Sequence, residues 1–305
     1  MDPILLIVQT ALILGFQYAL VAMALFLSYR ILDVADLTTD GCFVLGAAVS
    51  VTLTAAGHPI LALPAAMLAG ACAGFVTAFL QTRMGVPSIL AGIITNFGLY
   101  TVNFFAMGRR SNASLLKADT VFTLFRATGI GGGWYELILS AGITVLMGAL
   151  LFLFLGTRLG LSIRATGDNR DMVRASSVNP AYTVTVGLCL SNALTALSGA
   201  VVGQGQKTVD INMGTGIVVI GLACLIIGET VLGRRSIGRG ILAVMVGSVI
   251  YRFIYAAVLF TKVVPVEFLK LVTALVVALA IAAPAIREGV GLEKRKLTAG
   301  RKGGC

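Results

Sequence analysis

Long apolar runs, separated by short breaks that hold glycine, proline or charged residues, fill almost the whole chain. A helix needs roughly 20 apolar residues to cross the hydrocarbon core of a bilayer. Candidate spans that meet this criterion follow one another at about 4–27, 41–57, 60–82, 86–107, 135–156, 181–204, 210–232, 241–260 and 266–285. The pattern predicts an all-α fold, a polytopic transmembrane helical bundle of about 8–10 spans.

One scheme occurs twice along the chain: a long apolar helix, a polar break, and then a short apolar segment that contains glycine. The first break holds Asp36, Thr38, Thr39, Asp40 and Gly41, and the second holds Asp210, Asn212, Gly214, Thr215 and Gly216. Such breaks are typical of discontinuous membrane helices, whose freed backbone groups face protein or a water-filled cavity. We therefore expect the two breaks to face each other's repeat. An interfacial loop followed by a helix N-cap would use the same residue types, so this alternative stays open.

These repeats divide the chain. Each unit continues with two more spans, and a single connecting span between the units gives the second unit an inverted topology. We expect a membrane domain over residues 1–285 and a basic tail at 286–305. Within the domain, the segments are repeat one at about 4–107, the connecting span at 135–156, a polar loop at 157–180 and repeat two at about 181–285.

Composition excludes a soluble globular domain, because 58% of the residues are hydrophobic and only 12% are charged. The net charge of +10 would suggest nucleic acid as a partner of a soluble protein. Here the cations gather in loops and in the tail, so membrane topology and contact with lipid explain them, and we expect no nucleic-acid partner. The positive-inside rule places the 157–180 loop and the C-terminus in the cytoplasm, and counting back places the N-terminus outside.

The stretch "LGLSIRATGDNRDMVRASSVNPAY", residues 159–182, is too polar to lie in lipid and too long for a tight turn. Gly167-Asp168-Asn169 has turn and cap chemistry, with Gly167 as a bend, and the residues that follow predict a short helix. An exposed helix that carries an apolar residue such as Met172 suits docking to another protein. A solvated loop that only sets orientation is the alternative.

Neutral polar residues also lie inside the spans. Asn96 and Asn103 are two helical turns apart and share a face, and Asn192 and Thr195 lie together on another span. They can line a path for a solute or join helices by hydrogen bonds. With the residues of the breaks, the candidate path residues are Asp36, Thr39, Asp40, Asn96, Asn103, Asn192, Thr195, Asp210 and Asn212. The path offers neutral hydrogen-bonding residues such as Asn96, Asn103, Asn192, Thr195 and Asn212, with no ring of buried cations that would suit phosphate and no acidic ladder that would suit metal ions. It therefore favours an uncharged or zwitterionic solute.

Three segments carry a resemblance to a known family. The loop "GTRLGLSIRATGDNRDMVRASSVNPAYTV", the first repeat "LGFQYALVAMALFLSYRILDVADLTTDGCFVLGAAVS" and the second repeat from "LSNALTALSGAVVGQG" onward are similar to permease subunits of branched-chain amino acid and ribose-type ABC importers. Together they cover roughly two thirds of the chain. The version "RILDVADLTTDG" most resembles the tryptophan/tyrosine-type branch. One departure is "IIGETVLGRR", where Glu229 stands among residues that are small in the family, and it leaves the substrate open.

The resemblance implies a multi-pass subunit of the bacterial plasma (inner) membrane that forms a dimer with a second permease copy. It also implies cytoplasmic ATPase subunits and an extracytoplasmic solute-binding protein as partners. The chain itself has no P-loop, because Gln206 in "GQGQKT" stands where the glycine before Lys207 is needed. ATP and Mg²⁺ would therefore be held by the partner, with no cofactor, metal site or catalytic residue in this chain. The residues expected to contact the ATPase are Arg164, Gly167, Asp168, Asn169, Arg170, Met172, Arg174 and Val178.

Other functions remain possible at this point. The resemblance favours an amino acid as the solute, aromatic or branched-chain, while nucleosides, sugars or other small metabolites are alternatives within the same class of importer. A secondary transporter or channel independent of ATP would also show inverted repeats and broken helices. An intramembrane enzyme would need clustered ionisable or thiol groups at depth, and the sequence has no such cluster.

Overall fold

The computed structural model describes residues 3–116, 118–129, 132–233 and 236–260, and it is almost entirely helical in these ranges. The elements of repeat one are α1 (Pro3–Leu25), the π-helix η1 (Phe26–Ile31), α2 (Thr39–Ala55), α3 (Pro59–Thr82) and α4 (Ser88–Ala106). Between the repeats lie β1 (Asn112–Ser114), α5 (Val121–Ala127), the short 3₁₀ helix η2 (Gly132–Trp134), α6 (Tyr135–Leu155), α7 (Arg158–Asp168) and α8 (Arg170–Ala175). Repeat two holds α9 (Pro180–Gln206), β2 (Thr208–Asp210), α10 (Ile217–Leu232) and α11 (Ile237–Phe260).

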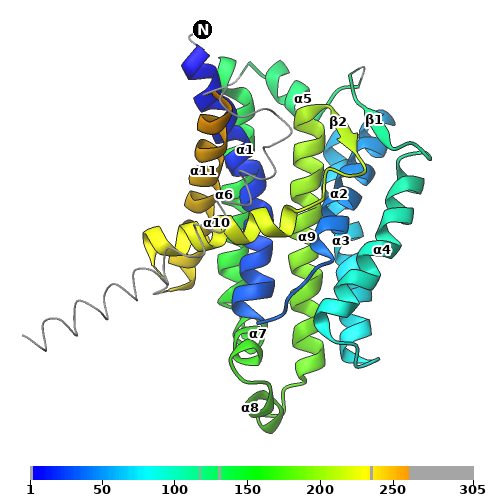
Figure 1. Ribbon diagram of the computed structural model, residues 1–305, viewed down its shortest axis with the longest axis vertical. Helices are drawn as coiled ribbons and strands as arrows, with labels where there is room; N and C mark the ends of the chain where they lie inside the picture. The colour runs from blue at the N-terminus through cyan, green and yellow to red at the C-terminus, as the bar shows by residue number, and fades with distance from the viewer. Residues whose placement is uncertain (1–2, 117, 130–131, 234–235, 261–305) are drawn as a thin grey trace, which may run out of the picture.

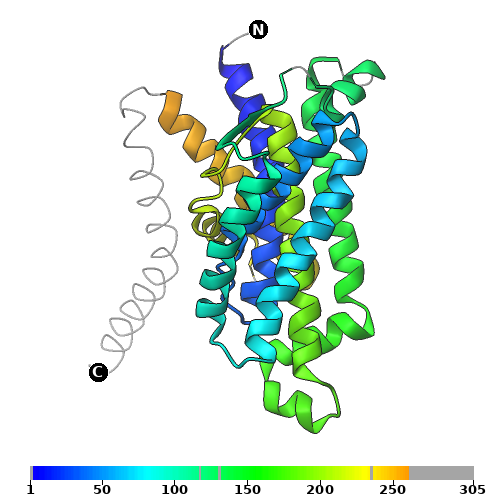
Figure 2. The same cartoon turned by 90° about the vertical axis from the view of Figure 1, so that its right-hand side faces the viewer.

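The long helices form a bundle around α9, which contacts α1, α2 and α3 (Figures 1 and 2). Small residues make this close packing possible. Gly199 of α9 lies against the carbonyl of Phe43, and Gly70 of α3 lies against the carbonyl of Asn192, with no room for a β-carbon at either position. In lipid, where water does not drive helices together, close backbone approach through glycine and alanine is a main source of helix association.

Within the described residues, six helical segments are long and apolar enough to cross a membrane: α1 with η1, α3, α4, α6, α9 and α11. The runs expected at 41–57 and 210–232 instead form shorter helices, α2 with 17 residues and α10 with 16 residues. At a rise of 1.5 Å per residue each is about 25 Å long, less than the roughly 30 Å of a hydrocarbon core. The expected span at 266–285 and the tail at 286–305 lie outside the described residues.

Both short helices begin near the middle of the bundle's height (Figure 1). The chain leaves η1 at the lower end of the bundle and returns upward before α2 begins, and it leaves α9 at the upper end and returns downward before α10 begins. The two breaks thus approach the middle from opposite ends, as inverted repeats with discontinuous helices require. This placement agrees with the discontinuous-helix interpretation and differs from an interfacial loop.

The two ends of the bundle carry different structures. The upper end holds the start of α1, helix α5 and the pairing of β1 with β2, in which Asn112 lies opposite Asp210 (Figure 1). The lower end holds α7 and α8. The segment 157–180 is therefore mostly helical and not an open loop, and its first helix, α7, was not expected from the sequence.

Candidate functional site

The first break is held in place by a network of buried polar groups. The carboxylate of Asp36, which is 3% exposed, accepts hydrogen bonds from the backbone N–H of Thr38 at 2.9 Å and from Nδ2 of Asn192 at 2.7 Å. The hydroxyl of Thr38 lies 2.8 Å from the hydroxyl of Thr77 on α3, and the hydroxyl of Thr39 donates to the carbonyl of Asp36. Since a buried carboxylate is costly without such partners, these bonds attach the break firmly to α3 and α9.

The second break repeats the local geometry of the first. The Oδ1 atom of Asp210 accepts the backbone N–H of Asn212 at 2.8 Å, as Oδ1 of Asp36 accepts that of Thr38. Both are turns in which an aspartate bonds the amide two residues further along. When the two aspartates are aligned, Asp40 in the first repeat corresponds to Gly214 in the second.

The two breaks contact each other through Asp40. Its Oδ2 atom accepts the N–H of Gly216 at 3.0 Å and its Oδ1 atom accepts the N–H of Val218 at 2.9 Å. A side chain from the first turn of α2 thereby caps the N-terminus of α10, where free amides and the helix dipole favour a negative charge. Gly214 lies against the backbone carbonyl of Asp40, where a β-carbon would not fit. The expectation that the breaks face each other's repeat is confirmed.

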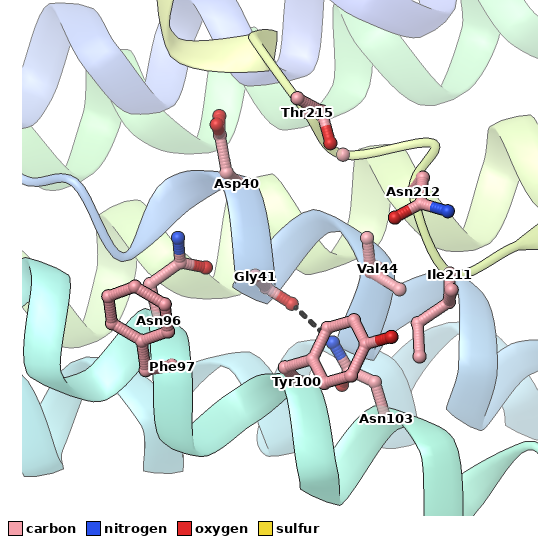
Figure 3. A pocket seen from close by; sticks show the side chains of 11 residues that line it. Asp40, Gly41, Val44, Asn96, Phe97, Tyr100, Asn103, Ile211, Asn212 and Thr215 are labelled. Atoms are coloured by element: carbon pink, nitrogen blue, oxygen red, sulfur yellow. Dashed lines mark hydrogen bonds between the residues drawn. The ribbon is translucent and has the colours of Figure 1, made fainter.

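An open cleft of about 390 Å³ lies between these breaks and α4. Its lining residues are Asp40, Gly41 and Val44 of α2, Asn96, Phe97, Tyr100 and Asn103 of α4, and Ile211, Asn212, Gly214 and Thr215 of the second break. Figure 3 shows the rings of Phe97 and Tyr100 along α4 and the side chains of Asp40 and Thr215 on the opposite side. The cleft therefore combines one carboxylate, neutral amides, hydroxyls and aromatic rings.

Amide groups from α4 shape the floor of the cleft. Asn103, which is 1% exposed, donates from Nδ2 to the carbonyl of Gly41 at 3.0 Å, while its Oδ1 atom has no hydrogen-bond partner among the described residues (Figure 3). Such an orphaned buried acceptor is uncommon and suits a donor that comes from outside the chain. The Oδ1 atom of Asn96 lies against Gly41, so any side chain at position 41 would displace it.

The structure divides the expected path residues into groups. Asp40, Asn96, Asn103 and Asn212 line the cleft together. Buried side chains that pack among α2, α3 and α9 form a second group: Asp36, Thr39, Asn192 and Thr195. Asp210 ends β2 and holds the turn before Asn212. Asp36 and Asn192 of this group bond the first break to α9, while the hydroxyls of Thr39 and Thr195 bond to carbonyls three and four residues earlier in the chain. A place for this group in the path stays a prediction.

Sequence reasoning missed the aromatic side of the cleft. Tyr100 lies four residues after Asn96 and three residues before Asn103, so the three side chains share one face of α4. That spacing was available from the sequence. Ile211 and Thr215 carried no comparable signal, because their position depends on how the second break folds back onto α2.

The segment expected to dock a partner contains the predicted short helix, α8. Asn169 caps it, since its Oδ1 atom accepts the N–H groups of Asp171 and Met172 at 3.0 and 3.1 Å. Met172 is 69% exposed, whereas Val173 is buried against the bundle. The expectation of a bend at Gly167 is wrong: this residue is helical in α7, and it lies so close to the carbonyl of Ile31 that a side chain would not fit.

The remaining residues of that segment are distributed over two surfaces. Arg170 and Arg174 are exposed on α8, and Val178 is half-buried where the chain approaches α9. Arg164 and Asp168 of α7 instead line a second pocket with Arg30 and Glu229. The segment thus has one face toward solvent and one toward the bundle.

Comparison with known proteins agrees with this architecture. Residues 7–282 match the family described as branched-chain amino acid transport system / permease component. The chain is 32% identical to the tyrosine transport system permease protein of Clostridioides difficile, over 91% of this chain and 90% of that protein. It is 23% identical to the probable branched-chain amino acid transport permease protein LivH of Methanocaldococcus jannaschii, over 81% of each chain. It is 24% identical to the guanosine ABC transporter permease protein NupP of Bacillus subtilis, over 78% of this chain and 69% of that protein.

No solved structure shows a significant match to the chain. The family match covers most of the sequence, and the six long apolar helices and two shorter ones of the described residues suit a membrane permease. The chain belongs to the branched-chain amino acid transport system permease family, the membrane-spanning transport subunits of ABC importers.

Proposed function

We propose that this permease carries an amino acid with an aromatic side chain across the bacterial plasma membrane, and that the cleft between the two breaks is where the solute meets the chain. The observation that carries the proposal is the chemistry of that cleft. The rings of Phe97 and Tyr100 lie on α4 beside two amides, and the carboxylate of Asp40 and the amide of Asn212 come from the other elements that line the cleft. The similarity to a tyrosine transport permease points to the same class of solute.

The ammonium group and the side chain of an aromatic amino acid each have a complementary group in the cleft. The amide oxygens of Asn96 and Asn212 can accept hydrogen bonds from an ammonium group, and Asp40 supplies a negative charge nearby. Phe97 and Tyr100 offer ring faces to an aromatic side chain. The described residues that line the cleft include no Lys or Arg, which disfavours a phosphorylated solute. A volume of about 390 Å³ suits a small molecule.

A nucleoside is the second candidate, since one relative is a guanosine permease and neutral amides with aromatic rings also suit a base. The two candidates differ in charge. A zwitterion gains from the Asp40 carboxylate, whereas a neutral nucleoside does not.

Transport in this proposal depends on partners that supply energy and substrate. A separate ATPase holds ATP and Mg²⁺ and contacts α8 from the cytoplasm through Met172, Arg170 and Arg174. An extracytoplasmic binding protein delivers the solute at the opposite end, and a second copy of the permease completes the pathway. The exposed apolar residue flanked by cations on α8, at the end of the bundle away from β1 and β2, supports this orientation.

Uptake into proteoliposomes tests the proposal. The permease is reconstituted with its ATPase and binding protein, and uptake of radiolabelled tyrosine, tryptophan, leucine and guanosine is measured with and without ATP. We expect ATP-dependent uptake of tyrosine or tryptophan in preference to leucine and guanosine. Uptake of guanosine alone would overturn the amino acid assignment, and uptake that is equal without ATP would overturn the coupling to an ATPase.

A further inference from the structure

A second pocket, of about 320 Å³, lies where η1, α7, the end of α10 and the start of α11 meet. Its charged and polar lining residues are Arg30, Arg164, Asp168, Glu229 and Ser236. None of these residues lines the cleft between the breaks. In this pocket the α7–α8 segment meets the C-terminal end of α10, the helix whose N-terminal end lies at the cleft.

An ion pair in this pocket joins the two repeats. Nε of Arg30 on η1 lies 3.1 Å from Oε1 of Glu229 on α10. The Glu229 side chain is 5% exposed and that of Arg30 is 45% exposed. A carboxylate so deeply buried needs compensation, and Arg30 supplies part of it, so the pair links the position of η1 to that of α10.

Helix α10 is attached at both ends by a side chain from repeat one. Asp40 binds the amides of its first turn, and Arg30 binds Glu229 near its last turn. Between these points Gly221 lies against Leu25 of α1, so the helix rests closely on its neighbour. Figure 1 shows α10 running across the long helices of the bundle. A helix of 16 residues is about 24 Å long, so α10 leads from the cleft at its first turn to the second pocket near its last turn.

The α7–α8 segment is in turn attached to η1. Gly167 of α7 lies against the carbonyl of Ile31, which directly follows Arg30, and the contact leaves no room for a β-carbon, so α7 packs directly on the backbone of η1. The π-helical winding of η1 is a local departure from the α-helix that is frequent at functional sites. A continuous series of contacts thus leads from α7 through η1 and the ion pair to α10 and the cleft.

We propose that the Arg30–Glu229 pair transmits the position of the α7–α8 segment to α10, and through α10 to the cleft. This inference rests on the proposed function, because it takes α8 as the ATPase contact and the cleft as the solute contact. Arg30 and Glu229 are positioning residues in this scheme, since they touch neither solute nor nucleotide. The sequence already singles out Glu229 as a departure from the resembled family.

The test measures accessibility of the cleft and does not require the solute to be known. Asn212 is replaced by Cys in a background in which the accessible Cys72 and Cys189 and the terminal Cys305 are Ser, while the buried Cys42 and Cys224 are kept. The permease and its ATPase are placed in lipid nanodiscs, and the rate of labelling by a water-soluble thiol reagent is compared with and without nucleotide. ATP hydrolysis and thermal stability are measured on the same samples.

Glu229→Gln, Arg30→Gln and the double variant are then compared in this background. We expect each to reduce the nucleotide-dependent change in labelling by about fivefold or more, in the usual range of coupling between sites. The double variant loses no more than either single variant, because both remove the same link. It also removes both charges of the pair together, so it avoids leaving the Glu229 carboxylate without Arg30. Asp33→Asn is the matched control: it removes one exposed carboxylate just after η1 and keeps a residue type that tolerates the positive φ of that position.

Full nucleotide dependence in the stable double variant would overturn the proposal. The proposal would also be overturned if the loss in the double variant equalled the sum of the losses in the two single variants and thermal stability fell in parallel. That result would show that the two residues have a structural role only. Failure of the proposed function looks different: the Asn212→Cys permease with Arg30 and Glu229 intact would itself show no nucleotide-dependent labelling. A wrong assignment of the solute would leave every one of these readouts unchanged.

Discussion

The contact between the two breaks can be tested by removing the side chain that makes it. Asp40→Ala deletes both hydrogen bonds to the first turn of α10, at Gly216 and Val218. Loss of a helix cap costs about 1 kcal/mol, and loss of a negative charge at a partly buried helix N-terminus costs about another 1 kcal/mol. Opening of this turn should therefore become easier by about 2 kcal/mol, which is roughly a 30-fold change in its equilibrium constant.

Hydrogen exchange measured by mass spectrometry reports this opening directly. Peptides that cover residues 213–220 should lose protection by roughly 30-fold in Asp40→Ala, because exchange through local opening follows the opening equilibrium. Asp40→Asn keeps one acceptor oxygen and should lose roughly fivefold, for a cost of about 1 kcal/mol. Asp33→Asn, an exposed acid before the first break, is the control and should change nothing there.

Two results would refute the reasoning. Unchanged protection of residues 213–220 in Asp40→Ala would mean that the cap does not hold the start of α10. Loss of protection spread evenly over α1, α9 and α10 would mean that Asp40 supports the bundle as a whole and not this contact.

Three further predictions concern the cleft and the docking helix. Gly41→Ala should reduce uptake by about fivefold, because the added methyl group pushes the Asn96 amide into the cleft. Gly98→Ala, whose methyl group meets open space, should leave uptake unchanged and keep or improve helix stability. Equal uptake in both variants would argue against the cleft as the path. Tyr100→Leu removes a ring–ring contact, so it should weaken apparent affinity for an aromatic solute by about tenfold relative to leucine. The measure is the KM for uptake of the aromatic solute divided by the KM for uptake of leucine. An unchanged ratio would exclude stacking on this residue. Met172→Glu should weaken binding of the ATPase to the permease by about tenfold in a pull-down titration, since it places a charge in an apolar contact, and binding of normal strength would remove α8 from the interface.

Local pattern was sufficient to locate the long helices and the two breaks. The apolar runs located the six long helices to within a few residues, and the two polar breaks located the short ones, because the need to satisfy the backbone in lipid leaves few alternatives to helices. The cap at Asn169 and the helix after it were also readable, since capping involves residues only two or three positions apart. The same local pattern misjudged Gly167, where the reason for glycine is a neighbour distant in sequence.

What only the tertiary structure decided is which polar side chains meet. The sequence placed Asp36 and Asp40 in one break as equivalent candidates, yet the fold buries Asp36 against Asn192 and directs Asp40 to the start of α10. It likewise contained Arg30 and Glu229 without indicating that they pair. Hydropathy and helical period are properties of consecutive residues, so they determine the elements and their faces. The partners of a side chain depend instead on how helices nearly 200 residues apart cross and rotate against each other, and close packing of small residues sets that arrangement.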